Sequence, residues 1–232
     1  MISFPKFSYL RDVAKRPAKM ISDLKRDNSG VAFVEFAFAA PMFLSLGLTG
    51  TETAYYVITH MQVSQIAMQV ADNASRVGEA DVLEEKRVFE DDITEVFVGA
   101  EKLGIDIDVF ENGRIILSSL QRNSEGGQWI AWQRCRGLKN HASSYGVEGD
   151  GETGTSFPGM GANATKIQAS SGTAVMFVEI SFTYESLTPF NFLEGREIDY
   201  TAAFNIRDSR DLTQLHGADD GQAVASCSTF TA

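Results

Sequence analysis

A predominantly apolar run near the N-terminus, residues 31–50, most constrains how this chain folds. It reads VAFVEFAFAAPMFLSLGLTG and holds one formal charge, Glu35. A helix rises about 1.5 Å per residue, so this run would span about 30 Å as a helix, the thickness of the hydrocarbon core of a bilayer. The run therefore predicts one transmembrane helix, which divides the chain into a short head and a long body.

Charge is distributed unevenly on the two sides of this run. The net charge of the chain is −11; residues 1–30 balance to +4, which leaves −15 for the remainder. Lys25 and Arg26 directly precede the run, whereas no lysine or arginine follows it until Arg76. The positive-inside rule then places the N-terminus in the cytoplasm and the body across the membrane, and disfavours a soluble protein with a buried helix. Because phosphate binding needs dense cationic clusters, the acidic body predicts no nucleic-acid partner.

The helical pattern continues beyond the apolar run. Residues 51–77 contain neither proline nor glycine, and their apolar side chains recur every seven residues, at Tyr56, Val63, Val70 and Val77. This spacing predicts an amphipathic stalk helix, residues 51–78. Its apolar stripe is expected to pack against the body of the protein, against neighbouring subunits, or against each along different parts.

The rest of the chain predicts a second helix followed by strands. Apolar residues keep helical spacing over residues 88–103, and Gly104 then supplies a stop signal. Beyond it the period changes to two, with Asn112 and Gly113 as a hairpin turn between the first two strands. The strand candidates are residues 105–110, 115–120, 128–136, 173–184 and 198–206. We expect an α+β fold with a long N-terminal transmembrane and stalk helix, a second helix and an antiparallel sheet of about five strands.

Four segments follow from these patterns: a basic cytoplasmic leader, residues 1–30; the transmembrane helix, 31–50; the stalk, 51–78; and an extracytoplasmic α+β domain, 79–232. Within that domain, residues 137–172 are rich in Gly, Ser and Asn and predict a long loop. Its carboxylates Glu148, Asp150 and Glu152 are weak candidates for a metal site. Their spacing is not that of an EF-hand, and a solvated loop is the alternative.

Motifs that carry chemistry are sparse. The sequence holds no HExxH, GxSxG, P-loop or dinucleotide glycine motif, so we expect neither enzymatic activity nor a cofactor. The carboxylates of Glu90, Asp91 and Asp92 fit a favourable interaction with a helix dipole. Cys135 and Cys227 match no metal signature. They are expected either to form a disulfide, if the body lies outside the cytoplasm, or to remain unpaired thiols.

Glu35 is a carboxylate at a depth where carboxylates are costly, so it needs a partner. One available partner is the α-amino group that a cut before Val31 would release. Gly30 at the cut, Glu35 five residues later and Phe36 beside it match the pattern of prepilin-type substrates. From Arg26 to Val77 the chain resembles the TadE-like minor pseudopilins of the tight-adherence (Flp) type IV pilus assembly system. Further residues of the resemblance are Pro41, Gly50 and Glu52, and more loosely Pro189 and Arg207.

The resemblance implies a membrane-anchored pseudopilin that assists pilus assembly. A prepilin peptidase would cut after Gly30, and the freed amine of Val31 would pair with Glu35 of a neighbouring subunit, beside Phe36. Implied partners are that peptidase, the major pilin, other pseudopilins or pilus assembly proteins, and the membrane. The implied location is the bacterial inner membrane, crossed once, with the C-terminal domain in the periplasm or associated with the pilus. The alternative is an uncleaved single-pass periplasmic binding protein or adhesin.

Overall fold

The computed structural model describes residues 23, 25, 27, 30–79, 85–162, 166–189, 192–218 and 221–232. The predicted basic leader, residues 1–30, lies outside the described residues except at four positions. Tertiary contacts divide the chain into two units, residues 1–51 and residues 52–232. The transmembrane prediction concerns the first unit, and the α+β fold lies in the second, which begins at residue 52 and so includes most of the predicted stalk.

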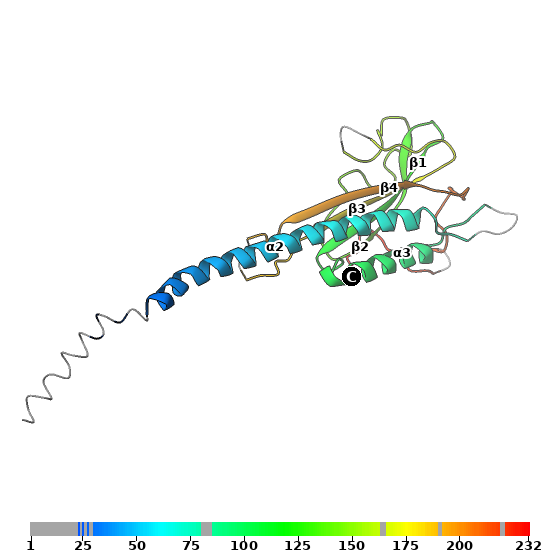
Figure 1. The fold of residues 1–232 in the computed structure, drawn as a ribbon. Helices are drawn as coiled ribbons and strands as arrows, with labels where there is room; N and C mark the ends of the chain where they lie inside the picture. Colours follow the sequence, from blue (N-terminus) through cyan, green and yellow to red (C-terminus); the bar gives the residue numbers. More distant parts are fainter. Residues whose placement is uncertain are drawn as a thin grey trace, which may run out of the picture. The chain divides into compact units, whose positions relative to one another are not determined.

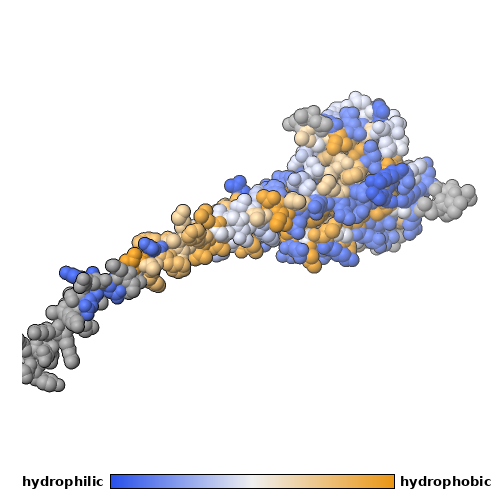
Figure 2. All heavy atoms as spheres, in the orientation of Figure 1, coloured by the Kyte–Doolittle hydropathy of each residue, from blue (hydrophilic) through white to orange (hydrophobic). Residues whose placement is uncertain are grey.

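In the first unit, helix α2 (Val31–Ala74) begins with side chains that face outward. Apolar residues dominate the surface of this part of the helix (Figure 2). The hydroxyls of Ser45, Thr49 and Thr51 donate to backbone carbonyls three or four residues earlier, at 2.7–2.9 Å. These three hydroxyls are therefore satisfied within the helix itself, as the interior of a bilayer requires. By length and composition, α2 is able to cross a membrane.

In the second unit, the apolar stripe of α2 is buried against the body of the same protein. The buried side chains recur at helical spacing: Val63, Ile66, Ala67, Val70, Ala71 and Ala74. The helix ends at Ala74, and Val77 lies beyond it, partly buried against the same core. Packing within the chain therefore accounts for this part of the stripe.

The second unit is an α+β fold, as predicted. Helix α3 spans Glu90–Leu103 and ends at Gly104. The strands are β1 (Gly113–Arg122), β2 (Gln128–Arg136), β3 (Val175–Thr183) and β4 (Glu197–Asn205). They form one antiparallel sheet in the order β2-β1-β3-β4, so among the described residues the sheet has four strands rather than about five.

The strand predicted over residues 105–110 is wrong. Ile105–Ile107 form a short 3-10 helix, and Asp108 then takes a left-handed conformation with φ of 49°. Val109 and Phe110 both lie in the cluster that the helices cover, whereas successive residues of a strand point to opposite faces of the sheet. The hairpin partner predicted for β1 also has no free edge to occupy, because β2 and β3 pair with its two sides.

The two faces of the sheet bury separate apolar clusters. Helices α2 and α3 cover one face, where Leu117 and Val178 lie in the core (Figure 1). On the other face, Met160 packs with Ile130 and Phe177. Met160 belongs to the segment predicted as a long loop, residues 137–172, which contains no helix or strand of its own among its described residues. This loop is thus a packed cover for the sheet.

The outer edge of β2 is closed by two separate segments. The N–H of Ile130 donates to the carbonyl of Asp150 at 2.9 Å, and the N–H of Cys135 donates to the carbonyl of Ala225 at 2.8 Å. A disulfide of 2.04 Å joins Cys135 to Cys227, so the two predicted cysteines are bonded to each other. The C-terminal tail, residues 225–232, is thereby fixed along this edge.

The buried side chain of Arg114 binds the same tail. The side chain is 1% exposed, and its guanidinium donates to the carbonyls of Gly137, Cys227 and Thr229 at 2.8–3.1 Å. The guanidinium also lies 4.2 Å from the centre of the Phe230 ring. Burial lowers the pKa of Arg114, and the three carbonyls supply the acceptors that a buried cation needs.

Candidate processing and subunit-pairing site

The predicted processing site lies where α2 begins. Gly30 is an exposed turn residue directly before the first helical residue, Val31, and the N–H of Val34 donates to the Gly30 carbonyl at 3.1 Å. A Cβ added at Gly30 would meet no described atom within 4 Å, and Gly30 is not among the positive-φ glycines. Neither packing nor backbone conformation in the described structure therefore requires glycine at position 30.

Glu35 and Phe36 lie one turn further along α2, and both are exposed. The spacing of four residues between Val31 and Glu35 places them on the same face of the helix. No described residue donates a hydrogen bond to Glu35 or forms an ion pair with it. The Phe36 ring is 68% exposed. The described structure thus gathers the predicted processing and pairing residues at one helix end, with exposed side chains.

The three predicted metal-ligand candidates are not brought together. Glu148 accepts a hydrogen bond from the Arg134 guanidinium at 2.9 Å. Asp150 accepts one from the N–H of Val147 at 2.8 Å, and Glu152 lies exposed at a separate pocket. Among the described residues, no group of three or more His, Cys, Asp or Glu side chains is placed to hold a metal ion.

The acidic start of α3 makes structural contacts. Glu90 is 1% exposed and binds the Arg134 guanidinium through both carboxylate oxygens, with a shortest distance of 2.5 Å. Asp92 accepts a hydrogen bond from the N–H of Phe89 at 2.8 Å, which caps the helix. The ion pair ties α3 to β2. The negative side chains also lie at the N-terminus of α3, where the helix dipole favours them.

Glu52 is a polar anchor that sequence reasoning did not single out as a site. Its side chain is fully buried and accepts hydrogen bonds from the hydroxyls of Tyr184 and Ser186, both at 2.7 Å, and from the N–H of Thr188 at 2.9 Å. We call this group the Glu52 clamp; it ties α2 to the segment that follows β3. Glu52 lies four residues before Tyr56, so its place on the buried stripe was the signal available in the sequence.

The Glu52 clamp stabilises a buried negative charge. Burial by itself would raise the pKa of Glu52, but the hydrogen bonds from Tyr184, Ser186 and Thr188 outweigh it and lower the pKa to about 2. Burial, together with the hydrogen bond to Glu52, raises the pKa of Tyr184. At neutral pH the carboxylate is therefore ionised and the phenol protonated, an arrangement that fixes structure.

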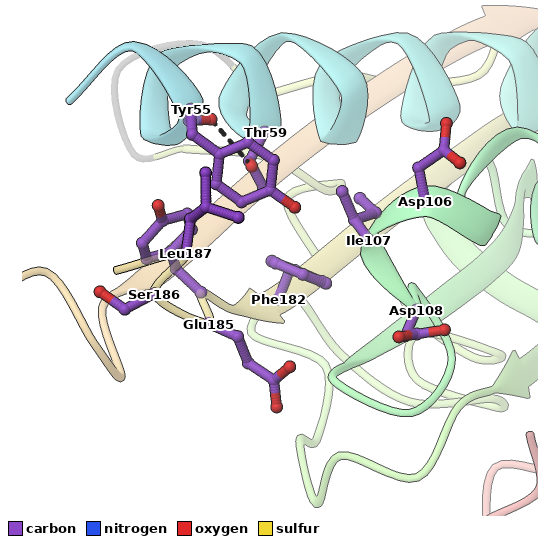
Figure 3. Close-up of a pocket in the computed structure, with 10 residues that line it drawn as sticks. Tyr55, Thr59, Asp106, Ile107, Asp108, Phe182, Glu185, Ser186 and Leu187 are labelled. Carbon is purple, nitrogen blue, oxygen red and sulfur yellow. Dashed lines mark hydrogen bonds between the residues drawn. The ribbon is translucent and has the colours of Figure 1, made fainter. Parts of the chain in front are cut away.

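A small cavity of about 140 Å³ lies beside the clamp (Figure 3). Tyr55 and Thr59 line it from α2, and the Thr59 hydroxyl donates to the Tyr55 carbonyl at 3.0 Å. Asp106, Asp108 and Glu185 make another part of its wall acidic. The cavity is smaller than the roughly 300 Å³ from which small-molecule sites usually begin.

These features define a class of protein: one N-terminal helix that is able to cross a membrane, followed by an α+β unit. The chain carries a TadE-like segment, because the family model described as TadE-like protein matches residues 30–76. The match confirms the resemblance and includes Gly30, Glu35 and Glu52. No curated protein and no solved structure matches the chain. The TadE-like segment and the helix together fit a protein associated with tight-adherence pili.

Proposed function

We propose that this protein is a membrane-anchored pseudopilin that assists assembly of a tight-adherence type IV pilus. A prepilin peptidase cuts after Gly30, and the new α-amino group of Val31 pairs with Glu35 of a neighbouring subunit. The chain crosses the bacterial inner membrane once, with its N-terminus in the cytoplasm and the α+β unit in the periplasm. Its partners are the major pilin and other pilus assembly proteins, and it has no enzymatic activity of its own.

The observation that carries this proposal is the TadE-like match over residues 30–76, which begins at Gly30. A Cβ at this position meets no described atom within 4 Å, and the backbone does not require glycine. A requirement for glycine would then come from a molecule outside the chain, and a peptidase that grips the backbone closely is such a molecule. The partner of the exposed Glu35 would likewise come from outside the chain, because a carboxylate in a bilayer needs a partner that the described chain does not provide.

Support for the location comes from the first unit and from the disulfide. The apolar surface of α2 up to residue 50 suits lipid or other helices (Figure 2). The Cys135–Cys227 disulfide suits an oxidising compartment such as the periplasm.

The test of processing is the intact mass of the membrane-extracted protein from cells with and without the prepilin peptidase. We expect a mature chain that begins at Val31 only when the peptidase is present. Gly30→Leu should leave the chain full-length, whereas the matched control Gly47→Leu should be cut normally, because Gly47 is an equally open glycine of α2. Full-length wild-type protein in the presence of the peptidase would refute processing.

The test of pairing uses Glu35→Gln, which keeps the shape of the side chain and removes its charge. We expect normal cleavage and at least a tenfold decrease in the number of piliated cells, because the neutral amide cannot compensate a buried α-amino group. Glu95→Gln, at an exposed position of α3, is the control and should assemble normally. Normal piliation of the Glu35→Gln strain would contradict the pairing role.

A second candidate function is that of an uncleaved single-pass binding protein or adhesin. The observation that favours it is a pocket of about 560 Å³ near the turn between β1 and β2, lined by Gln121, Asn123, Trp129 and Thr153 among others. Its volume lies in the usual range of small-molecule sites, and Trp129 is only partly buried. The mass measurement also separates the two candidates, since the second requires the full-length chain.

A further inference from the structure

We propose that the outer edge of β4 is a docking edge for an extended segment of a partner protein that carries lysine or arginine at alternate positions. The partner segment adds a fifth strand to the sheet through main-chain hydrogen bonds. This inference concerns the second unit alone and does not depend on cleavage at Gly30 or on pairing at Glu35.

The hydrogen-bond pattern of β3 and β4 shows which backbone groups of β4 face outward. At one end of the pair, the N–H of Tyr184 donates to the Arg196 carbonyl; at the other, the N–H of Ile206 donates to the Ala174 carbonyl. The register between these ends has no shift, so the even-numbered residues of β4 bond to β3 and the odd-numbered ones face away. The outward groups are those of Glu197, Asp199, Thr201, Ala203 and Asn205, and no described residue pairs with their backbone.

The other edge of the same sheet, formed by β2, is covered by other segments of the chain. The N–H groups of β2 that point outward are taken by the 137–172 loop and by the C-terminal tail, as for Ile130 and Cys135. Gln133 continues the pattern, because its N–H donates to the Glu148 carboxylate at 2.8 Å. Proteins usually shorten, bend or cover a sheet edge that is not meant to pair. Strand β4 has nine residues with neither proline nor a bulge, and the described residues leave its edge uncovered.

The acidic side chains of β4 indicate that the docking segment is basic. Glu197 and Asp199 are exposed neighbours on the outward-facing set, and only Glu197 has a described cation near it, the Lys139 ammonium at 3.2 Å. Directly opposite residues of antiparallel strands lie about 5 Å apart, so cations there would face these two carboxylates. Thr201 and Ala203 continue the edge with small side chains, which suit β-branched or hydroxyl residues of the partner. The net charge of −15 over residues 31–232 also favours a basic segment.

The experiment titrates the full-length protein in detergent micelles with two synthetic peptides and follows amide hydrogen exchange. The basic probe is acetyl-Thr-Val-Thr-Val-Lys-Val-Lys-amide, and the acidic probe replaces both lysines by glutamate. We expect the basic probe to bind at least tenfold tighter than the acidic one. We also expect it to slow exchange of the outward amides of β4, such as those of Asp199 and Thr201, at least tenfold.

Two variants make the test specific. Thr201→Pro removes one outward N–H and no bond to β3, so it should weaken the basic probe about fivefold, the effect of losing one hydrogen bond of about 1 kcal/mol. Thr201→Val keeps the N–H and should bind like the wild type. Asp199→Lys, at an exposed position that leaves the core intact, should reverse the preference between the probes.

Three results would overturn the proposal. The first is equal binding of both probes by the wild type. The second is protection of amides elsewhere than on β4. The third is protection of the outward β4 amides in the absence of peptide, with exchange that becomes slower as the protein concentration is raised. The edge would then be occupied by a second copy of the chain.

Discussion

The Glu52 clamp offers the most direct test of how α2 is held in the second unit. The perturbation is Glu52→Gln, which keeps the size of the side chain but replaces one carboxylate oxygen by an NH₂ group. In the wild type, one oxygen accepts from the Tyr184 and Ser186 hydroxyls and the other accepts from the N–H of Thr188. The amide oxygen can serve only one side of this arrangement. If it faces the Thr188 N–H, the two hydroxyls must accept from the NH₂ group, and their own hydrogens lose the carboxylate as acceptor; if it faces the hydroxyls, the NH₂ group faces the Thr188 N–H, which is also a donor.

The expected cost follows from these contacts. At least one buried N–H or O–H loses the carboxylate as its acceptor, at about 1–3 kcal/mol, and the remaining hydrogen bonds change from charge-assisted to neutral, at about 1 kcal/mol more. The free energy of unfolding should therefore fall by about 2–4 kcal/mol. For a unit of this size, that corresponds to a Tm about 5–12 °C lower.

The pH dependence provides a second readout of the same variant. Folding lowers the pKa of Glu52 from an ordinary 4.5 to about 2, so the folded state favours the ionised form. This stabilisation is fully present above about pH 4.5 and is lost as the pH falls toward 2. Glu52→Gln lacks it, so the difference in Tm between wild type and variant should shrink as the pH is lowered from 6 to 3.

The assay is thermal unfolding of the full-length protein in detergent micelles, followed by near-ultraviolet circular dichroism of the buried aromatic residues. The matched control is Glu95→Gln, an exposed carboxylate of α3, whose Tm should stay within about 1 °C of the wild type. A Tm of Glu52→Gln within the same margin at pH 7 would refute the reasoning. A Tm difference that is constant from pH 6 to 3 would refute its electrostatic part.

Three further predictions concern the tail and the ion pair of the second unit. Replacing Cys227 with Ser removes a cross-link between residues 92 positions apart, and chain entropy predicts a loss of about 4–5 kcal/mol in urea unfolding. Arg114→Leu leaves three carbonyls without their donor, and hydrogen exchange of the tail amides should become at least tenfold faster. Arg134→Met strands the buried Glu90 and should cost about 3–5 kcal/mol in urea unfolding; Glu148→Gln, at a carboxylate that is 52% exposed, should cost under about 1 kcal/mol.

Local sequence patterns predicted helix α2 and strand β3. The stripe through Val63 and Val70 and the alternation in β3 each follow from a periodicity of the chain itself. Residues 105–110 show the same alternation, yet they form a 3-10 helix and a left-handed turn at Asp108. The reason is tertiary: β1 already pairs on both sides, so Ile107, Val109 and Phe110 are buried by packing in the core beside α2 and not by pairing, while Ile105 stays exposed.

The polar contacts could not be predicted, because their partners are distant in the sequence. Glu52 meets Tyr184 across 132 residues, and no local pattern encodes that meeting. Glu148 could be predicted as a metal ligand from its neighbours in the loop. In the structure its carboxylate instead accepts hydrogen bonds from the Arg134 guanidinium and from the N–H of Gln133 at the edge of β2. By contrast, the features of residues 30–36 are local, so sequence alone was enough to propose a role for them.

The tail along β2 also has a consequence for the order of events during biosynthesis. The ribosome makes the chain from its N-terminus, so β2 is complete long before Ala225 and Cys227 are made. Throughout that interval the outward N–H of Cys135 has no tail carbonyl to bond, and the strand presents an open template to any neighbouring nascent chain. The edge closes when the tail docks on it, and the Cys135–Cys227 disulfide then holds the tail in place, so this closure cannot be fixed before Cys227 has been made.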